Sequence, residues 1–173
     1  DWRDSYPYRA ISVFALHPIY LDMSVFREIL TDTEKAEFDA QQKSLNTLKT
    51  VDYEAVLDAK WHYIKIGYDK LSKNIFSSMA FLDFFAQNRN WLDPYAAFCY
   101  LRDLHHTSDY SQWGEFAKYS KDKLKKLSTS GLNLHYFVQF LLHQQLKSAS
   151  DYAHALGVGL KGDIAIGIAH DSA

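Results

Sequence analysis

Residues 160–173 of the sequence are LKGDIAIGIAHDSA. Within this stretch Ile164, Ile166 and Ile168 alternate with small residues, and a period of two is typical of a β-strand. Small and apolar residues occupy both faces, which favours a strand buried on both sides in a parallel sheet covered by helices. Such a strand needs partner strands for its backbone N–H and C=O groups. We therefore expect the chain to be a piece of a larger protein.

Carboxylates stand at both ends of the predicted strand. Asp163 precedes it and Asp171 follows it. In an α/β barrel the residues at the carboxyl ends of the strands line the active site, so Asp171 is the better candidate for a functional role. We expect Asp163, at the start of the strand, to be a structural partner for backbone N–H groups.

Composition excludes several classes of protein. The chain has 173 residues, of which 47% are hydrophobic and 23% charged, and this fits one globular domain with a core. The net charge of −2 gives no basic surface for nucleic acid, and Asp122 interrupts the basic run at residues 118–126, as in a solvated helix face. No apolar stretch approaches the ~18–20 residues of a membrane span. The single cysteine, Cys99, excludes an intrachain disulfide, and we expect a cytoplasmic protein.

Histidines, glycines and aromatic residues give no site of their own. His135 and His143 lie eight residues apart, whereas two imidazoles of one helix share an ion at i, i+4. The GVGLKG stretch at residues 157–162 precedes a strand instead of opening a helix, which is wrong for binding phosphate. We expect no metal and no cofactor. Aromatic residues are 16% of the chain and either stack on sugars or fill a core, and composition alone favours the core.

Helical patterning fills most of the chain. Apolar spacing and capping residues predict helices at residues 24–30, 32–45, 52–71, 74–88, 92–105, 121–127 and 133–156. Ser24 and Asp52 are expected N-caps, Pro94 is expected in the first turn of its helix, and Gly157 is expected to end the last helix in the left-handed region. The N-terminal residues read as a loop followed by an extended segment that Pro18 interrupts.

This order of elements resembles two strands of a βα array separated by a large helical insertion. The expected fold class is therefore mainly α, with one or two extended segments from a (β/α)8 barrel that this chain leaves incomplete. We divide the chain into a barrel loop and extended segment at residues 1–22, a helical insertion subdomain at residues 23–131, and a long helix with the following barrel strand at residues 132–173.

A set of short motifs resembles the amylomaltases, the 4-α-glucanotransferases or disproportionating enzymes of glycoside hydrolase family 77. Residues 4–8 (DSYPY) and 12–22 (SVFALHPIYLD) are similar to the family's Ser-Pro-Tyr loop and its S-x-F-A-x-x-P-x-x-I-D-L segment. Residues 51–53 (VDY), with Lys60 and Trp61, match the start of the family's helical insertion. Residues 91–98 (WLDPYAAF), 137–145 (FVQFLLHQQ) and 162–166 (GDIAI) resemble its W-L-x-x-Y-A-L-F, F-x-Q-W-L-F-x-x-Q and G-D-L-P-I motifs.

The motifs cover essentially the whole chain in the family's order, and this collinearity is specific. The additional Tyr6 is like the larger plant-cytosolic and Bacteroides-type members. Two residues depart from the family pattern. Ala165 stands where proline is usual, and His170 precedes Asp171 at a position that varies among members.

The resemblance implies retaining transfer of α-glucans. A carboxylate nucleophile forms a covalent glycosyl-enzyme, a carboxylic acid protonates the leaving oxygen, and a glucan hydroxyl replaces water as the acceptor. In the family these carboxylates lie in an Arg-Ile-Asp-His segment and in later barrel strands. This sequence contains no such segment, so we expect no catalytic residue within it.

What the resemblance leaves to this chain is one wall of the donor-sugar site. It implies that Tyr8 stacks on or bonds to the sugar near the scissile bond, and that Asp171 bonds to sugar hydroxyls. Tyr53 is implied as a remote glucan contact. The structural alternatives are that Tyr8 packs a loop, that Asp171 caps a helix and that Tyr53 lies in the core.

We therefore expect a part of a cytoplasmic 4-α-glucanotransferase. Its expected partners are maltooligosaccharides and other α-1,4-glucans, together with the rest of the parent polypeptide, and neither nucleic acid nor a membrane. The alternative is a self-contained helical protein-interaction module without catalysis. An Arg-Ile-Asp-His segment encoded beyond Ala173 would favour the enzyme, and a stop codon would favour the module.

Overall fold

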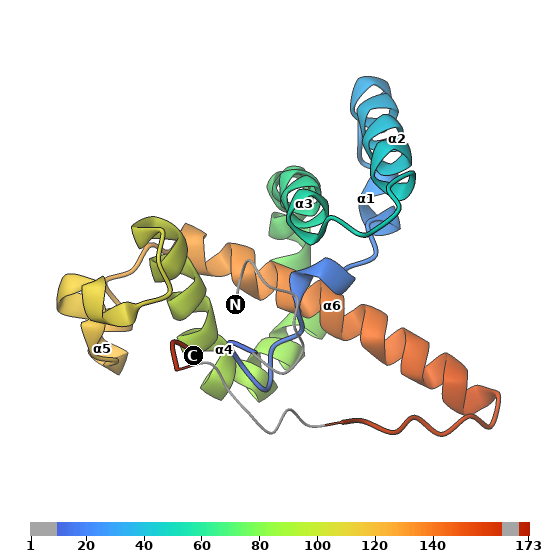
Figure 1. Cartoon of the computed structure of the whole chain (residues 1–173). Coiled ribbons are helices and arrows are strands. Elements are labelled where there is room, and N and C mark those ends of the chain that lie inside the picture. The colour runs from blue at the N-terminus through green and yellow to red at the C-terminus, as the bar shows by residue number, and fades with distance from the viewer. Residues whose placement is uncertain (1–9, 164–169) are drawn as a thin grey trace.

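Helices make up nearly all of the regular structure in the computed structural model, which describes residues 10–163 and 170–173. In chain order they are η1 (Pro18–Tyr20), α1 (Ser24–Arg27), α2 (Asp32–Asn46), α3 (Tyr53–Phe76), α4 (Met79–His105), η2 (Tyr110–Gln112), η3 (Gly114–Ala117), α5 (Lys121–Leu124) and α6 (Thr129–Ala155). The prediction of a mainly α chain is confirmed (Figure 1). The strand predicted around Ile164–Ile168 lies outside the described residues.

Helix α6 is a long rod that crosses the molecule (Figure 1). Helices α3 and α4 both pack against it. Every residue from His135 to Leu142 is buried, so this part of α6 is covered on all sides. Phe137 is fully buried there, stacks on Phe26 of α1 at 6.2 Å between ring centroids, and meets Tyr68 of α3 edge-on at 5.5 Å.

Side-chain caps fix where α2 and α3 begin. Thr31 accepts a hydrogen bond from the N–H of Glu34 at 3.2 Å, and the Glu34 carboxylate accepts one from the N–H of Thr31 at 2.7 Å. This reciprocal capping box satisfies two backbone donors that the helix leaves unpaired. Asp52 accepts from the N–H of Ala55 at 3.0 Å, which confirms the predicted N-cap of α3.

Helix α4 corrects the prediction of two separate helices at residues 74–88 and 92–105. A single helix runs from Met79 to His105 with Pro94 in its interior, and Ser78 caps it through the N–H of Phe81. Pro94 has no N–H for the i−4 carbonyl, a loss of about 3 kcal/mol in a helix interior. The residues around it are buried against the core, as Leu92 and Tyr95 show. Their burial keeps the helix continuous.

Several helix boundaries also differ from prediction. Ser24 is the first residue of α1 instead of its cap, and Asp22 accepts hydrogen bonds from its N–H at 3.0 Å and from its hydroxyl at 2.7 Å. Helices α1 and α5 end earlier than expected, and α6 begins before Asn133. Gly157 has a φ of 74°, so its left-handed conformation after α6 is confirmed.

A smaller core holds the connection between α4 and α6. Its buried residues are Ala97, Phe98, Leu101, Trp113 and Leu127. The indole N–H of Trp113 donates to the carbonyl of Thr107 at 3.0 Å, so the ring can be buried without an unpaired donor. The basic run at residues 118–126 lies beside this core and is mostly exposed, as predicted for a solvated face.

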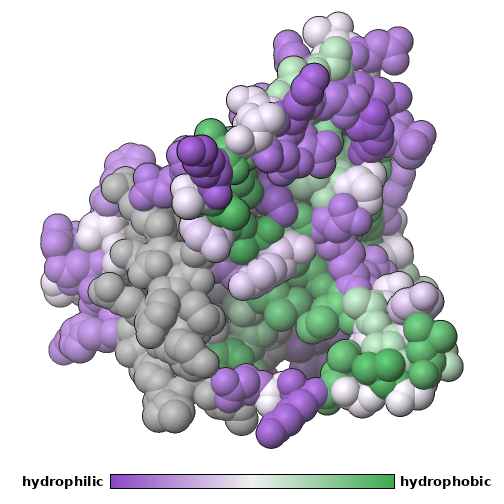
Figure 2. Space-filling view, turned by 45° about the vertical axis from the view of Figure 1, so that its right-hand side comes forward, coloured by the Kyte–Doolittle hydropathy of each residue, from purple (hydrophilic) through white to green (hydrophobic). Residues whose placement is uncertain are grey.

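The C-terminal half of α6 extends beyond the other helices (Figure 1). Leu146, Tyr152 and Leu156 are 53%, 70% and 63% exposed there. Figure 2 shows hydrophobic residues gathered at the lower right of the molecule, where this end of α6 lies. Among the described residues, no helix combines the length and the apolar character that a membrane span requires.

Candidate functional site

The segment at residues 11–22, which includes η1, lies against α3 and α6, and a glutamine of α6 holds its backbone. Gln139 is 2% exposed, and a buried amide needs hydrogen-bond partners. Its Oε1 accepts from the N–H of Leu16 at 2.9 Å, and its Nε2 donates to the C=O of Leu16 at 2.7 Å. One side chain therefore satisfies both backbone groups of Leu16, as a neighbouring strand would.

A second glutamine repeats this arrangement further along the same helix. Gln145 accepts from the N–H of Asp22 at 2.8 Å and donates to its C=O at 3.0 Å. The two glutamines are six residues apart on α6 (145 − 139), and their partners are also six residues apart (22 − 16). The second half of the segment is thus held to α6 at Leu16 and at Asp22.

A lysine of α3 holds the segment between these two points. The Nζ of Lys60 donates to the carbonyls of Ile19 at 2.5 Å and Leu21 at 2.8 Å. Burial lowers the pKa of Lys60, and the carboxylate of Asp22 acts in the opposite direction. We name Gln139, Gln145 and Lys60 the backbone clamp.

A buried polar cluster adjoins the clamp between α4 and α6. Gln139 also donates to the hydroxyl of Tyr95 at 3.4 Å. Arg102 is 6% exposed and pairs with Asp103 at 2.7 Å, and the Nε2 of His135 lies 3.8 Å from the same carboxylate. Burial, together with the nearby Arg102 charge, lowers the pKa of His135 to about 3. The imidazole is therefore neutral near pH 7, where it packs edge-on against aromatic rings.

The C-terminal residues return to the start of the extended segment. The N–H of Ala173 donates to the C=O of Ile11 at 2.7 Å. The ring of His170 stacks on Tyr110 of η2 with centroids 6.2 Å apart, and its Nδ1 lies 2.9 Å from Oδ1 of Asp171. Asp171, and to a lesser extent Asp109, raises the pKa of His170. Residues from opposite ends of the sequence therefore meet at one place.

The three predicted sugar contacts have different positions in the structure. Tyr8 lies outside the described residues. Asp171 belongs to the C-terminal residues beside Ile11, and its side chain is 37% exposed. Tyr53 is the first residue of α3 and is 51% exposed, so the alternative of a core tyrosine is wrong. Among the described residues, no hydrogen bond or ring contact joins Tyr53 to Asp171.

Exposed aromatic rings lie along the clamped segment. Phe14 and Tyr20 are 65% and 72% exposed. Phe14 stacks on Trp91 of α4 with centroids 6.1 Å apart, and Trp91 is itself fixed by a hydrogen bond to Asn88 at 3.0 Å. Such rings can stack on sugar faces.

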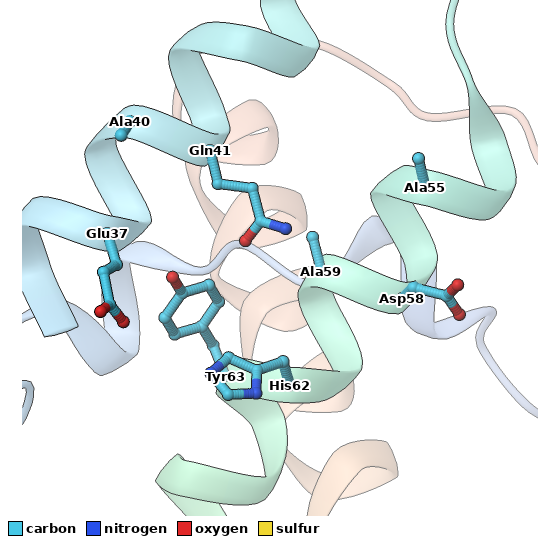
Figure 3. Close-up of a pocket in the computed structure, with 8 residues that line it drawn as sticks. All are labelled: Glu37, Ala40, Gln41, Ala55, Asp58, Ala59, His62 and Tyr63. Carbon is cyan, nitrogen blue, oxygen red and sulfur yellow. The ribbon is translucent and has the colours of Figure 1, made fainter.

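A separate open groove of about 710 Å³ lies between α2 and α3 (Figure 3). It is lined by Glu37, Ala40, Gln41, Ala55, Asp58, Ala59, His62 and Tyr63. Figure 3 shows Gln41 and Tyr63 directed into the space between the helices, whereas Asp58 points away from it. Neither the clamp residues nor Tyr53 and Asp171 line this groove. Within residues 10–163 and 170–173, no group of side chains is suited to hold a metal ion.

The clamp is the part of the site that sequence reasoning missed. Gln139, Gln145 and Lys60 were noted only as members of motifs. A glutamine inside a buried apolar run is itself a signal, because its amide must find a donor and an acceptor. Its partner lies 123 residues away in the chain, and helix periodicity does not reveal such a pairing.

Comparison with known proteins shows the family to which these motifs belong. The family model described as 4-alpha-glucanotransferase matches residues 1–173. The chain belongs to the 4-alpha-glucanotransferase family. In this member of the family, the motif at residues 137–145 supplies both glutamines of the clamp, and the motif at residues 12–22 supplies the backbone that they hold. The motif at residues 91–98 contributes Trp91 and Tyr95 to the same contacts.

Curated 4-alpha-glucanotransferases align with nearly all of the chain. The rice protein named 4-alpha-glucanotransferase DPE2 is 42% identical over 99% of this chain and 19% of its own length. The Chlamydia pneumoniae enzyme is 32% identical over 98% of the chain and 33% of its own length. The Clostridium butyricum enzyme is 27% identical over 96% of the chain and 34% of its own length. The chain therefore spans about a fifth to a third of these relatives. No solved structure matches it.

Proposed function

We propose that this chain is part of a 4-α-glucanotransferase that moves α-1,4-glucan segments between maltooligosaccharides. The observation that carries the proposal is the family match over residues 1–173. The fold supports it, because one backbone hydrogen bond joins the C-terminal residues, which include Asp171, to the residues that follow Tyr8 in the sequence. Tyr8 precedes Ile11 by three residues, Asp171 precedes Ala173 by two, and the N–H of Ala173 donates to the C=O of Ile11.

In this proposal the chain forms one wall of the donor-sugar site. Tyr8 stacks on the sugar near the scissile bond, and Asp171 accepts hydrogen bonds from sugar hydroxyls. One oxygen of Asp171 is held by His170 at 2.9 Å, and its other oxygen has no partner among the described residues, so it can accept from a hydroxyl. Tyr53, exposed at the start of α3, is the weaker candidate for a remote glucan contact.

The reacting groups come from the rest of the parent polypeptide in this proposal. A carboxylate from outside the chain forms the covalent glycosyl-enzyme, a carboxylic acid protonates the leaving oxygen, and a glucan hydroxyl resolves the intermediate with retention. Residues 1–22 and the end of the chain belong to the barrel, and residues 23–131 form its helical insertion. We propose a cytoplasmic location for the parent protein.

The test is disproportionation by the full-length parent protein. Incubation with maltotriose should release glucose and produce longer maltooligosaccharides, which chromatography of the products resolves. The purified 173-residue chain should release no glucose under the same conditions. Formation of glucose and maltose without any longer product would show hydrolysis instead of transfer and would contradict the proposal.

A further inference from the structure

We propose that Gln139 and Gln145 are positioning residues for the donor-sugar site. This inference rests on the proposed function and extends it from the sugar contacts to the side chains that hold them in place. Both glutamines bond to the N–H and the C=O of a single residue in the segment at 11–22. Within the described part of the chain no hydrogen bond joins either glutamine to Asp171, so their proposed effect on that residue passes through the backbone.

The segment leads from the clamp to the proposed site. Leu16, held by Gln139, lies five residues after Ile11 in the sequence (16 − 11). Ile11 packs against both hydrophobic cores and accepts the hydrogen bond of Ala173. The position of Ile11 therefore fixes the backbone next to Asp171.

The clamp holds the segment in one register along α6. A side-chain amide that accepts and donates at the same residue is satisfied only when both groups face it. Two such pairs exist, and they are six residues apart both on α6 and on the segment. Lys60 holds two further carbonyls of the segment. Any other alignment of the segment along α6 would leave polar groups unpaired. Gln139 is buried, so each unmade bond there leaves a donor or acceptor away from water.

The variants are made in the full-length parent protein. Gln139→Met and Gln145→Met keep the length of the side chain and remove both hydrogen bonds. Gln144→Met is the matched control, because Gln144 is the exposed neighbour of Gln145 and makes no hydrogen bond among the described residues. Amide hydrogen exchange of the peptide that contains residues 11–22 should become faster in the two clamp variants and stay unchanged in the control.

Steady-state kinetics with maltotriose then separate positioning from folding. We expect kcat/KM to fall about tenfold or more in the clamp variants, because small displacements of binding groups reduce the rate strongly. The loss should be mainly a rise in KM, since the sugar contacts bind the donor and do not react. The melting temperature of Gln145→Met should stay close to that of the wild type, because its hydrogen bonds lie in an exposed region.

Gln139→Glu gives a readout that a general loss of stability does not produce. A protonated carboxylic acid can both donate to and accept from Leu16, whereas a carboxylate can only accept. Burial raises the pKa of such a carboxyl group. The ratio of the variant's kcat/KM to that of the wild type should therefore rise as the pH falls from 8 to 5, and the ratio for Gln139→Met should not.

The possible outcomes separate failure of the proposed function from failure of the clamp and of its positioning role. Absence of transfer by the wild-type parent defeats the proposed function, and hydrogen exchange still tests the clamp. Normal transfer with unchanged exchange at residues 11–22 in the Met variants shows that no clamp exists. Faster exchange with a wild-type KM shows that the clamp is structural only and overturns the positioning role.

Discussion

Gly67 of α3 lies directly under the ring of Phe26. A Cβ atom built on Gly67 would be 2.3 Å from Cε1 and 2.4 Å from Cδ1 of that ring. Phe26 is fully buried and stacked on Phe137, so it has no space into which to withdraw. The absence of a side chain at Gly67 is what lets α1 pack closely on α3.

Gly67→Ala should therefore destabilise the protein, although alanine normally favours a helix over glycine by ~1 kcal/mol. Overpacking costs of about 1–3 kcal/mol are typical, and we expect a net loss in this range, measured by urea denaturation followed by circular dichroism. Gly159→Ala is the control, because a Cβ there meets no atom within 4 Å. Equal free energies of unfolding for the two variants would contradict the packing explanation.

Pro94→Ala should stabilise the protein. The alanine N–H can restore the hydrogen bond that Pro94 denies to the interior of α4, and the helix is already continuous on both sides. The gain is reduced by ~0.4–1 kcal/mol, because alanine leaves the unfolded chain more freedom. We expect a net increase of about 1–2 kcal/mol in the free energy of unfolding. A decrease would mean that the ring of Pro94 contributes more to packing than its missing donor costs.

Stability should fall as the solution becomes acidic, and His135 should be one cause. Its pKa is lowered from 6.5 to about 3 in the folded protein, so below pH 6.5 the unfolded chain binds more protons. The stabilisation is complete above pH 6.5 and is lost progressively towards pH 3, by at most ~1.4 kcal/mol per pH unit. Glu34, with a pKa of about 2, stays ionised between pH 7 and pH 5 and does not contribute there.

His135→Gln should flatten this dependence between pH 7 and pH 5. Burial also lowers the pKa of His17, so part of the slope should remain. The measurement is the free energy of unfolding in urea at several pH values, and the slope is compared instead of the absolute stability. His154→Gln, at an exposed position of α6, should keep the wild-type slope. An unchanged slope in His135→Gln would remove His135 as a cause.

Thr31→Ala should loosen the start of α2. The substitution removes the hydroxyl that accepts from the N–H of Glu34, and loss of such a cap costs about 0.5–2 kcal/mol. Helix α2 has no buried residue, so we expect local fraying, seen as faster amide exchange in the first turn of α2. Thr33→Ala is the control, because Thr33 lies in the same turn without a capping role. Equal exchange in both variants would show that the box does not hold the helix end.

Local sequence patterns correctly predict the start of α3 and the end of α6. Asp52 was recognised as the cap of α3 because an aspartate before a helical pattern has one favourable use, and Gly157 was recognised after α6 because glycine adopts a positive φ without strain. The mainly α class followed from the spacing of apolar residues, and family membership followed from the order of short motifs.

Tertiary structure decided what local patterns leave open. Pro94 read as the start of a helix, but burial on both sides of it makes α4 continuous. The pairing of Gln139 with Leu16 joins residues 123 positions apart, and the pairing of Ala173 with Ile11 joins the two ends of the sequence. Spacing along a chain encodes which face of a helix is apolar. Which distant backbone satisfies a buried amide depends on how the helices pack, and only the folded chain brings those groups within hydrogen-bonding distance.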